Sequence, residues 1–289
     1  MRTRIILCGL VLALSGAAAS TATAQQAQTS APIPADMYCS GVLSTAAVSH
    51  DTYLITGEQS DYKTTFQEGD FVYINKGSSQ GVKVGDEFSV VRAMPRYYDI
   101  DWFKGQGSLL RAMGTLWADE GRLKVVVAQP KVAIAQIIES CDSMQRGDIV
   151  LPFAERPAPP LKAFENFDRF APPSGKSKAM IVTGKFYQGQ VGMHDIAYVN
   201  LGSAQGVKVG DYFRIFRYQT NHNEYTYQAW HLNTCIYGFG CAPGGWNGDN
   251  LPREVVGEAI VVRTGPNSSS VLITFSAREL FSGDFVEIE

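Results

Sequence analysis

The sequence predicts an all-β protein built from two tandem small β-barrel or sandwich units, produced by internal duplication and each carrying a long inserted loop or hairpin. Three observations lead to this prediction: a repeat inside the chain, short runs of β-forming residues, and glycine-rich turns between those runs. The 289 residues include 28 glycines, and 45% of them are hydrophobic, which is enough for a packed core.

The repeat is an ungapped match between residues 70–92 and residues 195–217, in which 14 of 23 positions are identical at an offset of 125. A second block matches at an offset of 136, where Gly121 meets Gly257. The larger offset means that the second copy has 11 more residues between the two blocks. Self-similarity of this kind indicates two copies of one structural unit.

Each copy reads as short strands separated by tight turns. Residues 71–74 and 88–91 are rich in β-formers, and the copies continue with strand-like runs such as residues 123–127. Between the first two runs lies Gly-Val-Lys-Val-Gly-Asp, residues 81–86. We expect its glycines to adopt positive φ, its valines to plug the core, and Asp86 to accept a hydrogen bond from a backbone N–H of its own turn.

The N-terminal residues have the three parts of a secretory signal peptide. Arg2 and Arg4 precede a ten-residue apolar run, and Ala-Thr-Ala stands before Gln25. The apolar run is too short to span a bilayer, and no later stretch is long and apolar enough to do so. We expect an exported bacterial protein in the periplasm or at the outer-membrane periphery, with no transmembrane segment after cleavage.

The resulting domain division has five parts. Residues 1–24 form the signal peptide, 25–37 a flexible N-terminal segment, 38–152 the first β-barrel unit, 153–177 a proline-rich linker, and 178–289 the second β-barrel unit.

Export changes the interpretation of the cysteines. After cleavage four remain, and an even number in an oxidising compartment predicts two disulfides. Three pairings are possible, and we favour Cys39 with Cys141 and Cys235 with Cys241, because each pair then lies within one half of the chain.

The two insertions between the matched blocks, residues 93–120 and 218–256, are the candidate functional segments. They contain 12 aromatic residues in 67 positions, which is denser than the 11% of the whole chain. Loops of this length are usually functional or disordered, and these are too aromatic for disorder. The residues that we expect to bind a partner are Tyr97, Tyr98, Trp102, Tyr225, Tyr227, Trp230, Tyr237 and Trp246.

Three interpretations of the insertions stay open at this point. The aromatic side chains cover only their own barrel or the linker, they pack against an envelope protein partner, or they stack on a cell-wall glycan. A secreted carbohydrate-active enzyme would instead need a pair of carboxylates, drawn from Asp99, Asp101, Glu224 and Asp249.

Other functional classes find no support in the sequence. A net charge of −3 and a pI of about 5.9 argue against a nucleic-acid partner, because phosphate contacts need a basic face. The chain contains no nucleophile-elbow, zincin or thiol-protease motif and no phosphate-binding glycine loop before a helix. We therefore expect a protein that is not an enzyme and takes no cofactor and no metal.

The repeated pattern resembles the C-terminal domain of the bacterial flagellar assembly protein T. The residues that carry the resemblance are Asn75, Gly77, residues 81–86, Phe88 and Arg92, together with their second-copy counterparts, Gly121, Gly257 and the closing Gly-Asp turns. The pattern is also similar to exported bacterial modules that are joined to LysM peptidoglycan-binding domains. The resemblance covers both copies but not the linker or the insertions, and it implies a non-enzymatic, envelope-associated β module.

Overall fold

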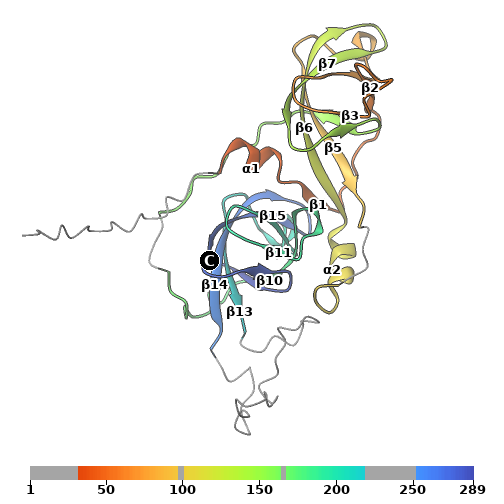
Figure 1. The fold of residues 1–289 in the computed structure, drawn as a ribbon. Helices are drawn as coiled ribbons and strands as arrows, with labels where there is room; N and C mark the ends of the chain where they lie inside the picture. The colour runs from red at the N-terminus through yellow and green to blue at the C-terminus, as the bar shows by residue number, and fades with distance from the viewer. Residues whose placement is uncertain (1–31, 97–100, 164–166, 219–251) are drawn as a thin grey trace, which may run out of the picture.

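The structure is a computed structural model that describes residues 32–96, 101–163, 167–218 and 252–289. The expected signal peptide, residues 1–24, and most of the segment 25–37 lie outside the described residues. The described chain is mostly β, with the two largest sheets stacked along the long axis of the molecule (Figure 1). None of the described helices is long and apolar enough to cross a membrane.

The first sheet is a seven-stranded sheet built from residues 42–152. Its path runs through β2 (Leu54–Gly57), β4 (Phe71–Ile74), β7 (Ala133–Ser140), β6 (Thr115–Ala128), β5 (Glu87–Met94) and β9 (Ile149–Pro152), while β1 (Val42–Ser44) pairs with β6. Backbone hydrogen bonds from Leu54 to Asp148 and from Val150 to Thr52 bring the two ends of the path together. The sheet therefore curls around its own core, in which Val72, Leu123 and Ala135 are fully buried.

The second sheet is a closed barrel, formed by residues 178–288. Its strand order is β10 (Lys178–Gly184), β12 (Ile196–Val199), β15 (Ser269–Ser276), β14 (Glu254–Thr264), β13 (Tyr212–Arg217) and β17 (Phe285–Ile288). The barrel core contains Ile181, Phe213, Val261 and Ile273, none of which is exposed. Runs of β-branched and aromatic residues at alternating positions explain why these segments form strands.

Short elements complete the fold. Two two-stranded sheets pair β3 (Thr65–Phe66) with β8 (Met144–Gln145) and β11 (Gln190–Val191) with β16 (Leu280–Phe281). The helices are α1 (Pro34–Tyr38) and α2 (Gln106–Met113), and single 3-10 turns are η1 (Ser78–Gln80), η2 (Lys185–Tyr187) and η3 (Ser203–Gln205).

Residues that are identical in the two sequence copies make the same hydrogen bonds in both sheets. The carboxylate of Asp86 accepts the Lys83 N–H at 2.8 Å, and that of Asp211 accepts the Lys208 N–H at 2.8 Å. The expected role of the aspartate in its own turn is therefore confirmed. The expectation for the valines is confirmed only in part, because Val82 and Val207 are buried whereas Val84 and Val209 are exposed, at 66% and 46%.

A matched ion pair closes both sheets at their β5–β9 and β13–β17 contacts. Arg92 donates from Nε and Nη2 to Asp148 at 2.7 and 2.6 Å, and Arg217 donates in the same way to Asp284 at 2.7 and 2.7 Å. Bidentate pairs of this kind fix orientation as well as charge, which explains why both residues recur at the same places in the repeat.

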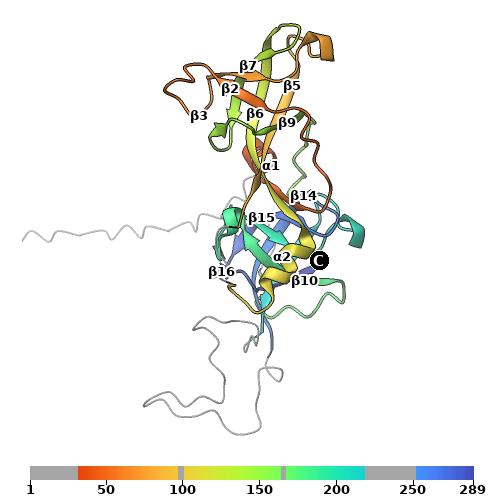
Figure 2. The same cartoon turned by 90° about the vertical axis from the view of Figure 1, so that its right-hand side faces the viewer.

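The first insertion and the N-terminal segment pack on the outside of the barrel. Figures 1 and 2 show α1, β1 and α2 beside β10, β14 and β15. Met37, Leu43, Leu110 and Met113 from these elements form one buried cluster with side chains of the barrel such as Ile260. The insertion that was expected to cover its own barrel or to face a partner thus covers the other sheet.

Helix α2 differs from the sequence-based expectation of an inserted loop or hairpin. Gln106, Leu110 and Met113 lie on one side of the helix and are buried against the barrel. Gly105 and Gly114, which flank the helix, both have positive φ, at 88° and 100°. Eight residues are too few for a helix that is stable alone, so packing on the barrel holds it.

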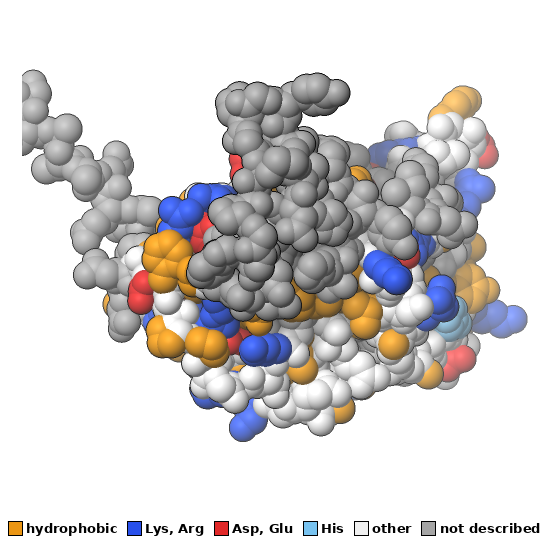
Figure 3. Space-filling model, turned by 90° about the horizontal axis from the view of Figure 1, so that it is seen from below, with side chains coloured by type: hydrophobic (Ala, Val, Ile, Leu, Met, Phe, Trp, Pro, Cys, Tyr) orange, Lys and Arg blue, Asp and Glu red, His pale blue; other side chains and the backbone are white. Residues whose placement is uncertain are grey.

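The proline-rich linker lies against the barrel. Phe167 packs on Phe275 with ring centroids 4.7 Å apart, and Ala171 is buried beside Phe216. Phe170 is 58% exposed. Seen from below, the described side chains of the molecule mix Lys and Arg with hydrophobic and acidic groups, so this face has no single sign of charge (Figure 3).

The disulfide between Cys39 and Cys141, favoured from the sequence, is confirmed. It joins the residue after α1 to the end of β7, with Cα atoms 5.4 Å apart, and it ties the N-terminal segment to the first sheet. Cys235 and Cys241, the other predicted pair, lie outside the described residues.

Candidate binding pocket

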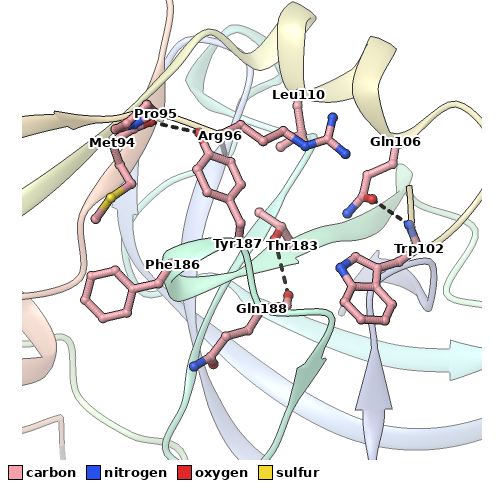
Figure 4. A pocket seen from close by; sticks show the side chains of 10 residues that line it. All are labelled: Met94, Pro95, Arg96, Trp102, Gln106, Leu110, Thr183, Phe186, Tyr187 and Gln188. Atoms are coloured by element: carbon pink, nitrogen blue, oxygen red, sulfur yellow. Dashed lines mark hydrogen bonds between the residues drawn. The ribbon is translucent and has the colours of Figure 1, made fainter. Parts of the chain in front are cut away.

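An open cavity of about 430 Å³ lies where the first insertion meets the barrel (Figure 4). One wall comes from the end of β5, the segment after it and α2, and the other from the end of β10 and the η2 turn. Most of the lining is apolar or aromatic: Met94, Pro95, Trp102, Leu110, Phe186 and Tyr187.

Trp102 is the only predicted partner-binding residue that the described chain places at this pocket. Its side chain is 42% exposed, and its ring lies against the backbone of Gly189, where a Cβ atom would stand 2.4 Å from Cε2 of the indole. The backbone N–H of Trp102 donates to Oε1 of the Gln106 side chain at 2.8 Å. A glycine at position 189 is therefore what lets the indole approach the barrel backbone this closely.

Gln106 connects the two walls of the pocket. Its side chain is almost fully buried, and its Nε2 donates to the Val182 carbonyl in β10 at 2.7 Å. Both ends of the amide are thus paired, one with the insertion and one with the barrel. This polar link fixes α2 and Trp102 relative to η2.

The opposite wall carries two neighbouring aromatic residues in an unusual backbone conformation. Phe186 and Tyr187 have φ of 57° and 60°, a region that non-glycine residues adopt rarely and at a cost of about 1–3 kcal/mol each. The Tyr187 hydroxyl donates to the Met94 carbonyl at 3.2 Å, and burial raises the pKa of Tyr187. Phe186 remains 42% exposed, so the strained turn presents a phenyl ring at the mouth of the pocket.

A charged pair borders the pocket. Arg96 donates from Nη2 to Asp101 at 2.8 Å, and this hydrogen bond holds the pKa of the Asp101 carboxyl below its usual range. Asp101 is also the one residue of the expected carboxylate set that is described, because Asp99, Glu224 and Asp249 lie outside the described residues. Its ion pair makes it a partner of Arg96 rather than a general acid.

The remaining predicted partner-binding residues cannot be placed. Tyr97, Tyr98, Tyr225, Tyr227, Trp230, Tyr237 and Trp246 all lie outside the described residues.

Sequence reasoning missed the wall formed by Phe186 and Tyr187. The signal available was the pair of consecutive aromatic residues separated by one residue from the strand that ends at Gly184. These two residues lie outside both insertions, where the aromatic residues are densest.

In the described part of the chain, no group of three or more His, Cys, Asp and Glu side chains is placed to hold a metal ion. Comparison with known proteins gives no relative: no family model and no curated protein matches the chain.

Proposed function

We propose that the chain is an exported, non-enzymatic protein of the bacterial cell envelope, made of two copies of one β-barrel unit. In this proposal it takes part in the assembly of the envelope or of a surface structure by binding a protein partner. The aromatic pocket at Trp102 receives an apolar or aromatic side chain of that partner. The same proposal places the protein in the periplasm or at the outer-membrane periphery.

The two-copy part of the proposal is supported by position-by-position agreement. The sheet order β2-β4-β7-β6-β5-β9 and the barrel order β10-β12-β15-β14-β13-β17 use sequence-equivalent strands at the same places. The ion pairs Arg92–Asp148 and Arg217–Asp284 are also equivalent.

The polar groups that line the pocket already have hydrogen-bond partners within the protein, and this observation favours a protein partner over a sugar. Both the oxygen and the nitrogen of the Gln106 side-chain amide are hydrogen-bonded. The Tyr187 hydroxyl donates to the Met94 carbonyl, and the Thr183 hydroxyl donates to the Gln188 carbonyl at 3.2 Å. A sugar ring needs several hydrogen bonds to replace those that its hydroxyls lose from water. An apolar side chain needs none, so the pocket suits a hydrophobic anchor of the kind that dominates protein interfaces.

A peptidoglycan or other carbohydrate ligand is the second candidate. The half-exposed indole of Trp102 favours it, because a flat aromatic face can stack on a sugar ring.

We expect a photo-crosslinking amino acid at position 186 to attach the mature protein to a specific envelope protein in extracts of its source bacterium. Phe186 is the exposed aromatic residue of the far wall, so a partner side chain in the pocket would touch it. Adding Trp102→Ala should reduce the crosslinked product about tenfold, since anchor residues of interfaces contribute at that level. The product is measured by mass spectrometry.

Two variants make this experiment decisive. Gly189→Ala should act like Trp102→Ala, because the added Cβ would push the indole off the barrel. Tyr62→Ala removes a 93% exposed tyrosine from the turn between β2 and β3 and should change nothing. Co-sedimentation with purified peptidoglycan sacculi, lost on Trp102→Ala and without any crosslinked protein, would instead favour the carbohydrate ligand.

The proposed export makes a separate prediction. After expression in a bacterium with a functional secretion system, N-terminal sequencing of the periplasmic protein should begin at Gln25, because Ala-Thr-Ala precedes it. Recovery of only the full-length chain in the cytoplasm would contradict export.

A further inference from the structure

Two further hollows adjoin the pocket at Trp102. Figure 4 shows the Phe186 ring and the end of the Gln188 side chain on the side of the pocket away from Trp102. The second hollow, of about 470 Å³, shares Phe186 and Gln188 with the pocket. The third, of about 550 Å³, shares Gln188 and Asp195 with the second. The three hollows therefore follow one another along residues 185–195.

The second hollow is a crevice between the first unit and the barrel. One wall contains Cys39 and Cys141, which are joined by the disulfide, and the other is formed by side chains between Lys185 and Ile196. Because a covalent bond and the strands of a closed barrel hold the two walls, a ligand does not have to order them.

Polar side chains of the second and third hollows are available to a ligand, in contrast to those of the pocket. Among the described residues, no side-chain hydrogen bond or ion pair involves Gln188, Gln190 or Glu279, and all three are exposed. Asp195 and Asp36 each accept one backbone N–H of their own turn through Oδ2, at 2.7 and 2.9 Å. Within the described chain, their Oδ1 atoms have no partner.

The second and third hollows together carry a negative charge. Their described lining contains three carboxylates and one ammonium group, which gives a net charge of −2 when His194 is counted as neutral. The ammonium of Lys185 lies 5.0 Å from the centroid of the Phe186 ring and pairs with none of these carboxylates. A cationic group of a ligand is therefore attracted here, and an anionic group is repelled.

We propose that the pocket and the two hollows form one groove, which binds an extended polypeptide segment with a lysine or arginine within a few residues of its apolar anchor. This inference rests on the proposed function, in which the pocket at Trp102 binds a protein partner. It names the chemistry of the segment that the partner presents.

The order of the hollows explains why an extended segment fits. Such a chain advances about 3.3 Å per residue, so neighbouring side chains of one segment can enter adjoining hollows. The apolar anchor fills the pocket, and the cationic side chain reaches Asp195 or Glu279. The amides of Gln188 and Gln190 pair with backbone groups of the segment. A neutral sugar could use these amides but would gain nothing from the net charge.

Photo-crosslinking from positions 186 and 190 of the mature protein tests the proposal, in envelope extract at about 50 mM NaCl, where charge attraction is screened little. Gln190 is exposed in the third hollow and its amide has no partner in the described chain, so the crosslinker replaces no contact there. Mass spectrometry should place both attachments on one segment of one partner. The two attachment points should lie within about six residues of each other and of a lysine or arginine.

The double variant Asp195→Asn, Glu279→Lys should lower the yield of the product from position 186 about tenfold, because attraction between exposed charges contributes at this level. An amide at position 195 still offers an oxygen to the Gly192 N–H, and Glu279 has no partner to lose in the described chain. Circular dichroism checks that the variant is folded. For the wild type, about 500 mM NaCl should lower the yield to a similar extent.

A matched variant controls for the change of net charge. Asp61→Asn, Glu68→Lys makes the same change at two exposed residues of the first unit, outside the groove, and should leave the yield unchanged.

The outcomes separate the groove from the pocket. A product from position 186 whose yield is equal in the wild type and the Asp195, Glu279 variant would overturn the groove and leave the pocket as a binding site. A partner segment without lysine or arginine, or attachment from position 190 to another protein or to none, would do the same. Absence of any product from position 186 would overturn the proposed function and the groove together.

Discussion

Replacing Asp119 with alanine is expected to lower the free energy of unfolding by about 3 kcal/mol, because it breaks a buried ion pair from one side. The Asp119 side chain is 2% exposed, and it accepts hydrogen bonds from Arg263 at 3.0 Å, from Arg156 at 3.3 Å and from the Gly41 N–H at 2.9 Å. These donors come from the barrel, the linker and the turn between α1 and β1. One carboxylate therefore ties three separate parts of the chain to β6.

The magnitude follows from what the substitution leaves behind. Removal of one partner from a buried pair costs about 3–5 kcal/mol, because the remaining charge has no counter-ion. Arg263 and Arg156 keep 26% and 21% of their side chains exposed, so water can solvate them in part and the lower end of the range applies. Burial already lowers the pKa of the Arg263 guanidinium despite the carboxylate beside it, which indicates how poorly the site tolerates the cation alone.

Urea unfolding of Asp119→Ala measures the effect, with Asp61→Ala as the control for loss of an exposed carboxylate. Hydrogen exchange of the Gly41 amide gives a local readout, because this amide loses its acceptor and should exchange faster. A double-mutant cycle with Arg263→Met isolates the pair, and we expect the second substitution to cost less once Asp119 is gone. Additive losses, or a loss below about 0.5 kcal/mol, would contradict the proposed role.

The repeated turns were predictable because their chemistry is local. Asp86 and Asp211 bind backbone N–H groups three residues earlier in their own turns, so sequence spacing alone determines the contact. The Cys39–Cys141 pairing was predictable for a different reason, since the expected export and the expected division of the chain into two halves left few combinations. In both cases the deciding information was contained in a short segment or in a count.

The placement of the first insertion could not be predicted from local signals. Gln106, Leu110 and Met113 have helical spacing, but two flanking glycines and a short length make the pattern weak. The helix forms because the outside of the barrel accepts these side chains, among them Gln106 on the carbonyl of a residue 76 positions later. The pocket depends on the same long-range contact, so its second wall at Phe186 was not foreseen.

The substitution Glu120→Val should raise the free energy of unfolding above that of the wild type at pH values above 7, by about 3 kcal/mol at most. Glu120 is the extra residue of a bulge in β6, and its side chain is 1% exposed. Neither of its carboxylate oxygens has a hydrogen-bond partner, and Nη1 of Arg92 is 3.4 Å away. Arg92 is already bound to Asp148 by two hydrogen bonds, so it compensates Glu120 poorly.

Burial therefore raises the pKa of Glu120 from 4.5 to about 7, against the opposing effect of Arg92. Between these two values the folded protein holds a proton that the unfolded chain has released. The contribution of Glu120 to the free energy of unfolding is therefore most favourable below pH 4.5. It falls as the pH rises toward 7 and stays reduced above pH 7. One pKa unit corresponds to about 1.4 kcal/mol, so the rise from 4.5 to about 7 limits the destabilisation by ionised Glu120 to about 3 kcal/mol.

The chain itself supplies the reason to expect that valine fits. At the repeat offset of 136, position 120 corresponds to Val256, which is 1% exposed in the barrel core. Denaturant unfolding of the wild type and Glu120→Val at pH 5, 6, 7 and 8 should give curves that differ little at pH 5 and separate as the pH rises. Glu120→Gln, which keeps the shape without the charge, should remove the same pH dependence. If the free energy of unfolding of the wild type changed with pH in parallel with that of both variants, Glu120 would not carry a buried proton. The pH dependence would then come from groups other than this bulge.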